Sequence, residues 1–370
     1  SSAASDVYKR QGYRALKAMT TGSRNNAIGT YSASQITTGD RNEAIGYGAM
    51  YNTTTGAYNI AIGYKSLHNT NANYNVGVGY EALHANTTGA DNTAVGALAL
   101  DASTTGDYNI AVGKGALTAN TTGSNNSALG TTALYANTTA NDNTAVGFQA
   151  LKANTTGAQN TAVGKDALDA NTTAHDNTAI GVGALGVMDG GDGKNIAIGN
   201  YAGDAITTGG SNTLLGYQAG TTLTTASNTV AIGAKAMANA TTPDFTIAIG
   251  QEALENMTTG ASNIAIGYNC LQAITTNSNN TVIGREAAKV ATCDRTTALG
   301  YRAAYAVTTG KENTCIGSEA LYTATTGTEN CAVGYYSLYN TTTGSYNTCL
   351  LYTSDAADEG LGVDLGGRRI

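Results

Sequence analysis

Few residues of this chain have the types and the spacing that catalysis or metal binding requires. A hydrolytic site needs a nucleophile with a base held close to it, and the 370 residues include only three histidines, His68, His84 and His175. His68 and His84 occupy equivalent positions of neighbouring repeats and could share a metal ion, but Lys, Asp and Tyr fill that position elsewhere. We interpret it as a variable, solvent-facing position. The sequence therefore predicts no enzyme, no cofactor and no metal site.

The cysteines and one acidic segment have structural explanations. Of the native cysteines Cys270, Cys293, Cys315 and Cys331, Cys270 and Cys315 replace alanine at small-residue positions of the repeat and are predicted to be buried free thiols. The sequence D-G-G-D-G at 189–193 resembles the calcium-binding turns of other β-rolls, but it occurs once and lacks their nonapeptide period. We expect a protruding turn there.

Tyrosine is the residue type best suited to binding. It follows the central glycine of many repeats, and its side chain offers amphipathic contact area at low entropic cost. The pattern predicts a contact surface for a host-surface glycan or protein receptor. The alternative is that the rings cover the coil edge or a groove between chains. The residues assigned to the contact surface are Tyr47, Tyr64, Tyr80, Tyr217, Tyr268, Tyr301 and Tyr335.

A 17-residue repeat, N-T-A-V-G-x-x-A-L-x-A-N-T-T-G-x-x, positions all of these side chains. Its central glycine recurs 20 times from Gly12 to Gly334, and 16 of the 19 intervals are 17 residues long. Only 12% of residues are charged, and the chain has no Trp and two Phe, too few large side chains for a thick globular core. The sequence predicts an all-β fold, a parallel β-solenoid of about 20 rungs.

Each rung has two side-chain columns that must face opposite ways, because neighbouring side chains alternate along a strand. The residue before the glycine is nearly always Val, Ile or Leu, and the residue before that is small in most rungs. We expect the aliphatic column to face the coil interior. The alanine column is then expected to pack against a neighbouring chain, or against the opposite wall of a very flat coil. The alanines assigned to the interchain face are Ala94, Ala111, Ala128, Ala145, Ala162 and Ala179.

Asparagine recurs four residues before the glycine, which predicts a ladder. At a strand spacing of ~4.8 Å, stacked amides can hydrogen-bond along the solenoid axis. The N-T-T triplets match glycosylation sequons, but their repetition at one turn position favours a structural role. The following T-T-G is expected to close the coil, with its glycine at positive φ. The ladder residues are Asn92, Asn109, Asn126, Asn143, Asn160 and Asn177.

The segments N-T-A-V-G and N-I-A-I-G, as at 143–147 and 263–267, resemble the YadA-like head repeats of trimeric autotransporter adhesins. The longer unit with A-L-x-A-N-T-T-G is similar to arrays in bacteriophage tail fibres, which often end in an endosialidase-type chaperone. The resemblance covers residues 12–348, although the period of 17 is longer than that of the adhesin heads. It implies a left-handed β-roll in a homotrimer whose small-residue face lies near the axis. It also implies an extracellular structural or adhesive fibre, on a virion tail fibre or a bacterial cell surface.

Other classes of function rank lower. A monomeric solenoid that binds a repetitive surface such as ice would present T-x-T pairs on a flat strand, whereas the T-T pairs here lie in a turn. A net charge of -7 without basic clusters gives no basis for nucleic-acid binding. No apolar run approaches the ~18 residues of a membrane span.

The two ends have a different origin from the repeats. Residues 1–11, SSAASDVYKRQ, match the translation of a transposase-type sequencing adapter, and CLLYTSDAADE at 349–359 matches its reverse complement. Such segments are excluded from fold reasoning. We therefore expect residues 1–11 and 349–370 to be adapter-derived and residues 12–348 to be a native repeat array, a fragment from an environmental read.

Overall fold

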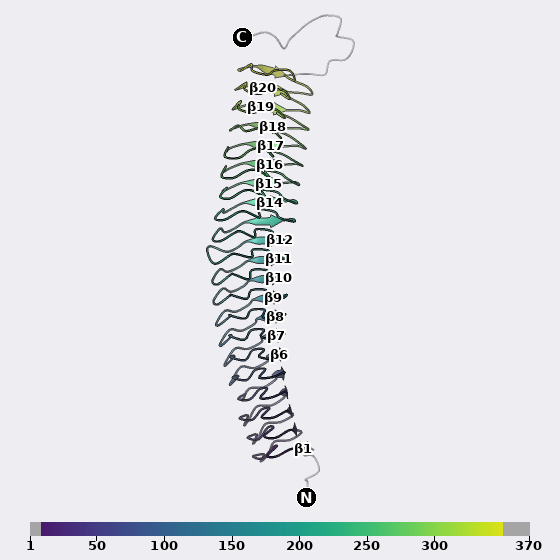
Figure 1. The fold of residues 1–370 in the computed structure, drawn as a ribbon, viewed down its shortest axis with the longest axis vertical. Coiled ribbons are helices and arrows are strands. Elements are labelled where there is room, and N and C mark those ends of the chain that lie inside the picture. Colours follow the sequence, from purple (N-terminus) through teal and green to yellow (C-terminus); the bar gives the residue numbers. More distant parts are fainter. Residues whose placement is uncertain (1–8, 351–370) are drawn as a thin grey trace, which may run out of the picture. The chain divides into compact units, whose positions relative to one another are not determined.

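The computed structural model describes residues 9–350, which form an all-parallel β-solenoid of about 20 turns, as predicted (Figure 1). Each turn contributes one strand of three residues, and no helix occurs in the described residues. The chain divides into two compact units, 1–193 and 194–370. Most of the two segments predicted to be adapter-derived lies outside the described residues.

The strands of the first unit are β1 (Lys9–Gln11), β2 (Asn26–Ile28), β3 (Glu43–Ile45), β4 (Ile60–Ile62), β5 (Val76–Val78), β6 (Thr93–Val95), β7 (Ile110–Val112), β8 (Ser127–Leu129), β9 (Thr144–Val146), β10 (Thr161–Val163) and β11 (Thr178–Ile180). Those of the second unit are β12 (Ile196–Ile198), β13 (Thr213–Leu215), β14 (Val230–Ile232), β15 (Ile247–Ile249), β16 (Ile264–Ile266), β17 (Thr281–Ile283), β18 (Thr297–Leu299), β19 (Thr314–Ile316), β20 (Cys331–Val333) and β21 (Thr348–Leu350).

Within each unit every strand pairs in parallel with its neighbours in sequence, in a constant register. Between β9 and β10, for example, Ala145 lies opposite Ala162 and Val146 opposite Val163. The register is kept across the 16-residue interval between β4 and β5, where Ala61 pairs with Gly77. The differences in repeat length therefore fall in the turns, and equivalent residues of successive repeats stack on one another.

The strand orientation corrects the prediction for the alanines. Ala145 and Ala162 have no exposed surface, whereas the residues on either side of them are half-buried. The coil is flat, since a Cβ added at Gly77 in the alanine column would lie 3.1 Å from Leu67 Cγ on the opposite wall. The aliphatic column points outward, and only the flat-coil alternative was right. The predicted interchain residues Ala94, Ala111, Ala128, Ala145, Ala162 and Ala179 are therefore core residues of a single chain.

The opposite wall is a turn that contains left-handed residues. In one such turn Leu151 is fully buried with φ 51° and Gln149 has φ 60°, and Gln159, in the bend before the next strand, also has φ 60°. Left-handed backbone costs an L-residue about 1–2 kcal/mol, so hydrogen bonds between turns must offset this strain. Each of the three N–H groups donates to a carbonyl of another turn, in the pairs Gln149 to Thr131, Leu151 to Ala167 and Gln159 to Asn141.

Two glycines per repeat are needed for different reasons. Gly147 has φ +139°, and a Cβ there would lie 2.3 Å from the carbonyl oxygen of Gly164 on the next turn. Gly157 of T-T-G was predicted to need a positive φ, which is wrong. A Cβ at Gly157 would instead crowd the Ala174 carbonyl oxygen at 2.4 Å. Alanine nevertheless fills this column at Ala140 and Ala174, so small shifts accommodate it.

Two buried asparagine ladders run through the first unit. Asn143 donates from its backbone N–H and its Nδ2 to Asn126 Oδ1, at 3.1 and 3.2 Å, and its Nδ2 also donates to the Gly157 carbonyl. The same side-chain bond joins Asn92, Asn109, Asn126, Asn143, Asn160 and Asn177 in series. A second ladder is built from the N-T-T asparagines, in which Asn154 Nδ2 donates to Asn137 Oδ1 at 2.9 Å. These sequon asparagines are fully buried, which fits a structural role.

Candidate functional surfaces

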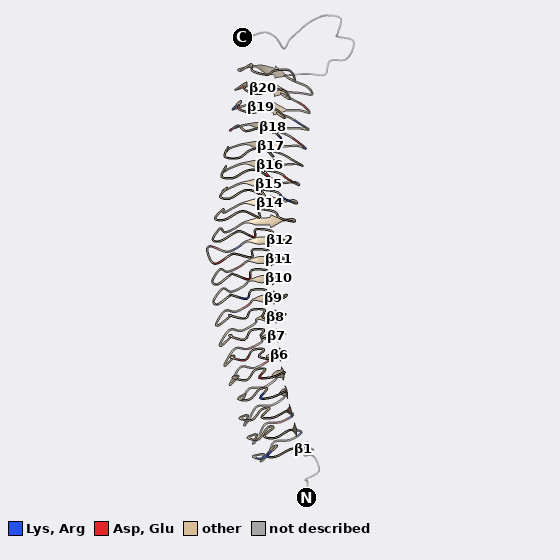
Figure 2. Ribbon diagram, viewed as in Figure 1, with Lys and Arg blue, Asp and Glu red and all other residues tan. Residues whose placement is uncertain are grey.

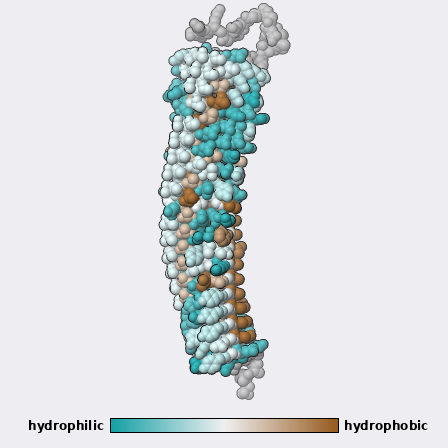
Figure 3. Space-filling model, viewed as in Figure 1, coloured by the Kyte–Doolittle hydropathy of each residue, from teal (hydrophilic) through white to brown (hydrophobic). Residues whose placement is uncertain are grey.

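Within each unit the outward strand residues before the central glycines form an aliphatic row, which we call the outer strand row. Several members are more than one-third exposed, including Leu129 at 51% and Ile62 at 39%. In β2–β21 the only charged strand residue is Glu43, and Figure 2 shows the strands almost entirely uncharged. A row of brown side chains is visible beside the strands of the first unit in Figure 3. In that unit the row is Ile28, Ile45, Ile62, Val78, Val95, Val112, Leu129, Val146, Val163 and Ile180.

Sequence reasoning missed this row, although one residue carried the signal. Residues i and i+2 of a strand share a face, so Glu43 shares a face with Ile45. An unpaired carboxylate inside a flat coil would be costly, and Glu43 therefore marks the aliphatic face as the outer one. Contiguous exposed apolar surface of this kind marks interaction sites.

The predicted tyrosine surface is brought together only in part. Tyr47, Tyr64 and Tyr80 lie on consecutive turns as a parallel stack, with ring centroids 5.5 and 5.4 Å apart and each ring 41–50% exposed. In the second unit Tyr268 and Tyr301 are separated by Arg285, whose guanidinium carbon lies 5.9 and 6.0 Å from their ring centroids.

The two remaining predicted tyrosines are also exposed. Tyr335 makes an edge contact with Tyr336 at 4.2 Å between centroids, and Tyr217 is 51% exposed. The predicted surface is therefore a set of separate aromatic patches. The triplet Tyr47–Tyr64–Tyr80 is the most regular of them.

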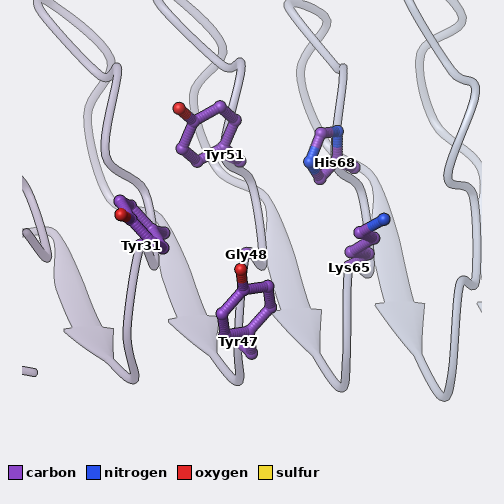
Figure 4. Close-up of a pocket in the computed structure, with 6 residues that line it drawn as sticks. All are labelled: Tyr31, Tyr47, Gly48, Tyr51, Lys65 and His68. Atoms are coloured by element: carbon purple, nitrogen blue, oxygen red, sulfur yellow. The ribbon is translucent and has the colours of Figure 1, made fainter. Parts of the chain in front are cut away.

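A pocket of about 320 Å³ lies beside this triplet and is lined by Tyr31, Tyr47, Gly48, Tyr51, Lys65 and His68 (Figure 4). Tyr31 makes edge contacts with Tyr47 and Tyr51, at 5.9 and 5.8 Å between ring centroids. Tyr51 stacks on His68 at 5.4 Å. Aromatic walls with a few polar groups are typical of small-molecule sites.

Among residues 9–350 no group of three or more His, Cys, Asp or Glu side chains is placed to hold a metal ion. The rings of His68 and His84 are 5.2 Å apart and tilted by 33°, and both residues are half-buried. Burial lowers the pKa of His68 below its ordinary 6.5, so its imidazole is neutral near pH 7. Its Nδ1 lies 3.1 Å from Asn69 Oδ1.

The remaining candidates have structural roles. Cys270, Cys293 and Cys315 are buried free thiols and Cys331 is a half-buried one. Burial raises the pKa of Cys270 to about 12, which suppresses the reactive thiolate. Within 189–193, residues 190–192 form a bend, and an Asp189 carboxylate oxygen accepts a hydrogen bond from the Thr172 hydroxyl at 2.7 Å.

Comparisons with known proteins add no family to this description. No protein-family model matches the chain, and no curated protein matches it. No helix in the described part of the chain has the length and apolarity of a membrane span.

Proposed function

We propose that the chain is a structural and adhesive fibre segment, extracellular on a virion tail fibre or a bacterial cell surface, in which three copies pack through their outer strand rows. Constant register from turn to turn fits a structural repeat protein. The resemblance to adhesin heads and tail fibres supports the number of copies and the location.

The outer strand row is the observation that carries this proposal. The row repeats on successive paired strands, so its side chains lie next to one another. Burying these side chains against other copies of the chain would remove aliphatic surface from water. A closed ring of three uses one surface patch against a different one on the next copy. The outward face offers two columns for this, since Thr144 and Val146 of β9 both point outward beside the buried Ala145.

Adhesion would use the surfaces that the turns present. The tyrosine triplet lies on the turn after the central glycine and not on the strand face, so a strand-to-strand interface leaves that column to bind a host-surface glycan or protein receptor.

The test is the mass of the full chain in solution, by analytical ultracentrifugation or mass photometry. We expect a trimer for the wild type and a monomer for Leu129→Glu, whose side chain is outside the coil. Thr131→Glu is the matched control and should remain trimeric, because Thr131 lies two residues after Leu129, at an exposed position of the turn that follows the strand. Circular dichroism checks that each variant is folded. A monomeric wild type would overturn the proposal.

A second candidate is binding to a repetitive surface such as ice. It is favoured by the threonines Thr144, Thr161 and Thr178, which are outward residues of three consecutive paired strands. Ser127 and Ile110 interrupt this column on the preceding strands. Thermal hysteresis from a monomeric chain would favour this candidate, and its absence would leave the fibre segment.

A further inference from the structure

The pocket beside the tyrosine triplet exists because one side chain is missing from a column. The residue two positions after each central glycine is Arg14, Tyr31, Gly48, Lys65 and Glu81 on successive turns of the first unit. Gly48 leaves a gap between its neighbours Tyr31 and Lys65, and Tyr47, Tyr51 and His68 form the sides of that gap (Figure 4). Its volume of about 320 Å³ is at the small end of the ~300–1,000 Å³ usual for ligand sites, and suits one sugar ring.

The walls supply flat apolar faces with polar edges. Three phenol rings and one imidazole line the pocket, and ring contacts hold them in place, since Tyr31 touches both Tyr47 and Tyr51 and Tyr51 stacks on His68. No aliphatic side chain other than the lysine stem is among the lining residues. A ligand that fits must present C–H faces to the rings and hydroxyl groups to the phenols and the neutral imidazole.

The pocket also carries an available positive charge. Lys65 forms no ion pair among residues 9–350, and its ammonium lies 5.4 Å from the centroid of the Tyr64 ring. The turns around the pocket have an excess of basic side chains although the whole chain has a net charge of -7. Residues 12–81 contain five basic side chains and three acidic ones, which are Arg14, Lys17, Arg24, Arg41 and Lys65 against Asp40, Glu43 and Glu81. Glu81 follows Lys65 in the same column and is the acidic residue that acts on His68.

From this geometry we infer that the Gly48 pocket binds a carboxylate-bearing saccharide, such as a uronic or a sialic acid unit. The sugar ring packs on the phenol rings, its hydroxyls hydrogen-bond to the tyrosine hydroxyls and His68, and its carboxylate pairs with Lys65. A neutral sugar would leave the lysine unpaired, and a purely aromatic anion would leave the polar edges unused. This site deepens the adhesive part of the proposed function and rests on it.

Gly48→Gln tests the site by filling the gap. A Cβ at Gly48 would meet Lys65 Cγ at 3.5 Å, an ordinary contact, and glutamine already occupies this column at Gln149 with the same left-handed φ. The fold should therefore tolerate the change. Gly115→Gln is the matched control, because Gly115 lies in the same column of the same unit with φ +67° and outside the pocket. Lys65→Gln removes the charge alone.

The probes are 3′-sialyllactose and a galacturonic acid trisaccharide, with lactose as the neutral comparison, titrated by calorimetry or ligand-observed NMR against the full chain. We expect the acidic probes to bind the wild type and Gly115→Gln equally. Gly48→Gln should weaken binding at least tenfold, and Lys65→Gln should remove the preference for acidic over neutral probes. No binding at millimolar probe, equal binding of lactose, or unchanged binding by Gly48→Gln would overturn the inference. The mass of each sample is measured in parallel, so that loss of the trimer and loss of sugar binding are distinguished.

Discussion

Asn126→Ala is the most informative test of what holds the turns together. Asn126 Oδ1 accepts the backbone N–H of Asn143 at 3.1 Å, and Asn126 Nδ2 donates to the Ala140 carbonyl at 2.8 Å. Removing the amide leaves the Asn143 N–H buried without an acceptor. The Ala140 carbonyl keeps a second donor, Asn137 Nδ2 at 3.1 Å, and is therefore not orphaned.

The expected cost follows from these groups. An orphaned buried donor costs ~1–3 kcal/mol and each lost hydrogen bond contributes about 1 kcal/mol net, so Asn126→Ala should destabilise the local turns by ~3 kcal/mol. Asn126→Thr should cost less, about 1 kcal/mol, because threonine already substitutes in this column. In that column the Thr229 hydroxyl donates to the Pro243 carbonyl at 2.9 Å. The Thr246 hydroxyl oxygen accepts the backbone N–H of Asn263 at 3.5 Å.

Hydrogen exchange is the suitable assay, because each turn of a solenoid is stabilised mainly by its neighbours. A loss of ~3 kcal/mol predicts roughly hundredfold faster exchange in the peptides that contain Asn126 and Asn143. Exchange should change little several turns away. If Asn126→Ala exchanged no faster than Asn126→Thr, the ladder amide would not be the stabilising group and the argument would fail.

Two further predictions concern glycine and cysteine positions. Gly147→Ala should lower the free energy of unfolding by several kcal/mol, since alanine would have to adopt the φ of +139° as well as crowd the Gly164 carbonyl. Gly157→Ala should be mild, because alanine already fills that column at Ala140 and Ala174; equal losses in denaturant unfolding would refute the role of the backbone conformation. Cys331 should react with a maleimide in the folded chain while Cys270, buried and with a raised pKa, stays unmodified until denaturation. Mass spectrometry of labelled peptides reads this out, and early labelling of Cys270 would contradict its burial.

The repeat made the fold predictable, because one 17-residue unit dictates the spacing of every strand and of every buried amide. The sequence did not predict which face of each strand points into the coil. The alternation of side chains shows which residues share a face, but it leaves open which of the two faces is buried. Alanine at the central strand position is small enough for either side. Glu43 decides the matter, but it is a single departure among about 20 otherwise similar rungs.

The pocket could not be predicted from the tyrosine pattern. It depends on the side chain that Gly48 lacks, and on Tyr31, Tyr51 and His68, which belong to two different columns on three turns. Their proximity follows from the width of the turn and from its left-handed residues, which a list of spacings does not contain. The signal in the sequence that was missed is Gly48, which stands between the large residues Tyr31 and Lys65 in one column.

The constant register has a consequence for how such a chain can change. Because each turn meets its neighbours through the same bonds, unequal recombination between repeats in the gene could remove or duplicate whole turns without creating a new kind of contact. Each event would alter the stack by one strand spacing, ~4.8 Å, while the junction kept its amide ladder and its alanine core. The number of turns is thus free to vary under selection for reach, and the residues that vary between turns, such as Gly48 and the tyrosines, record where copies have since diverged.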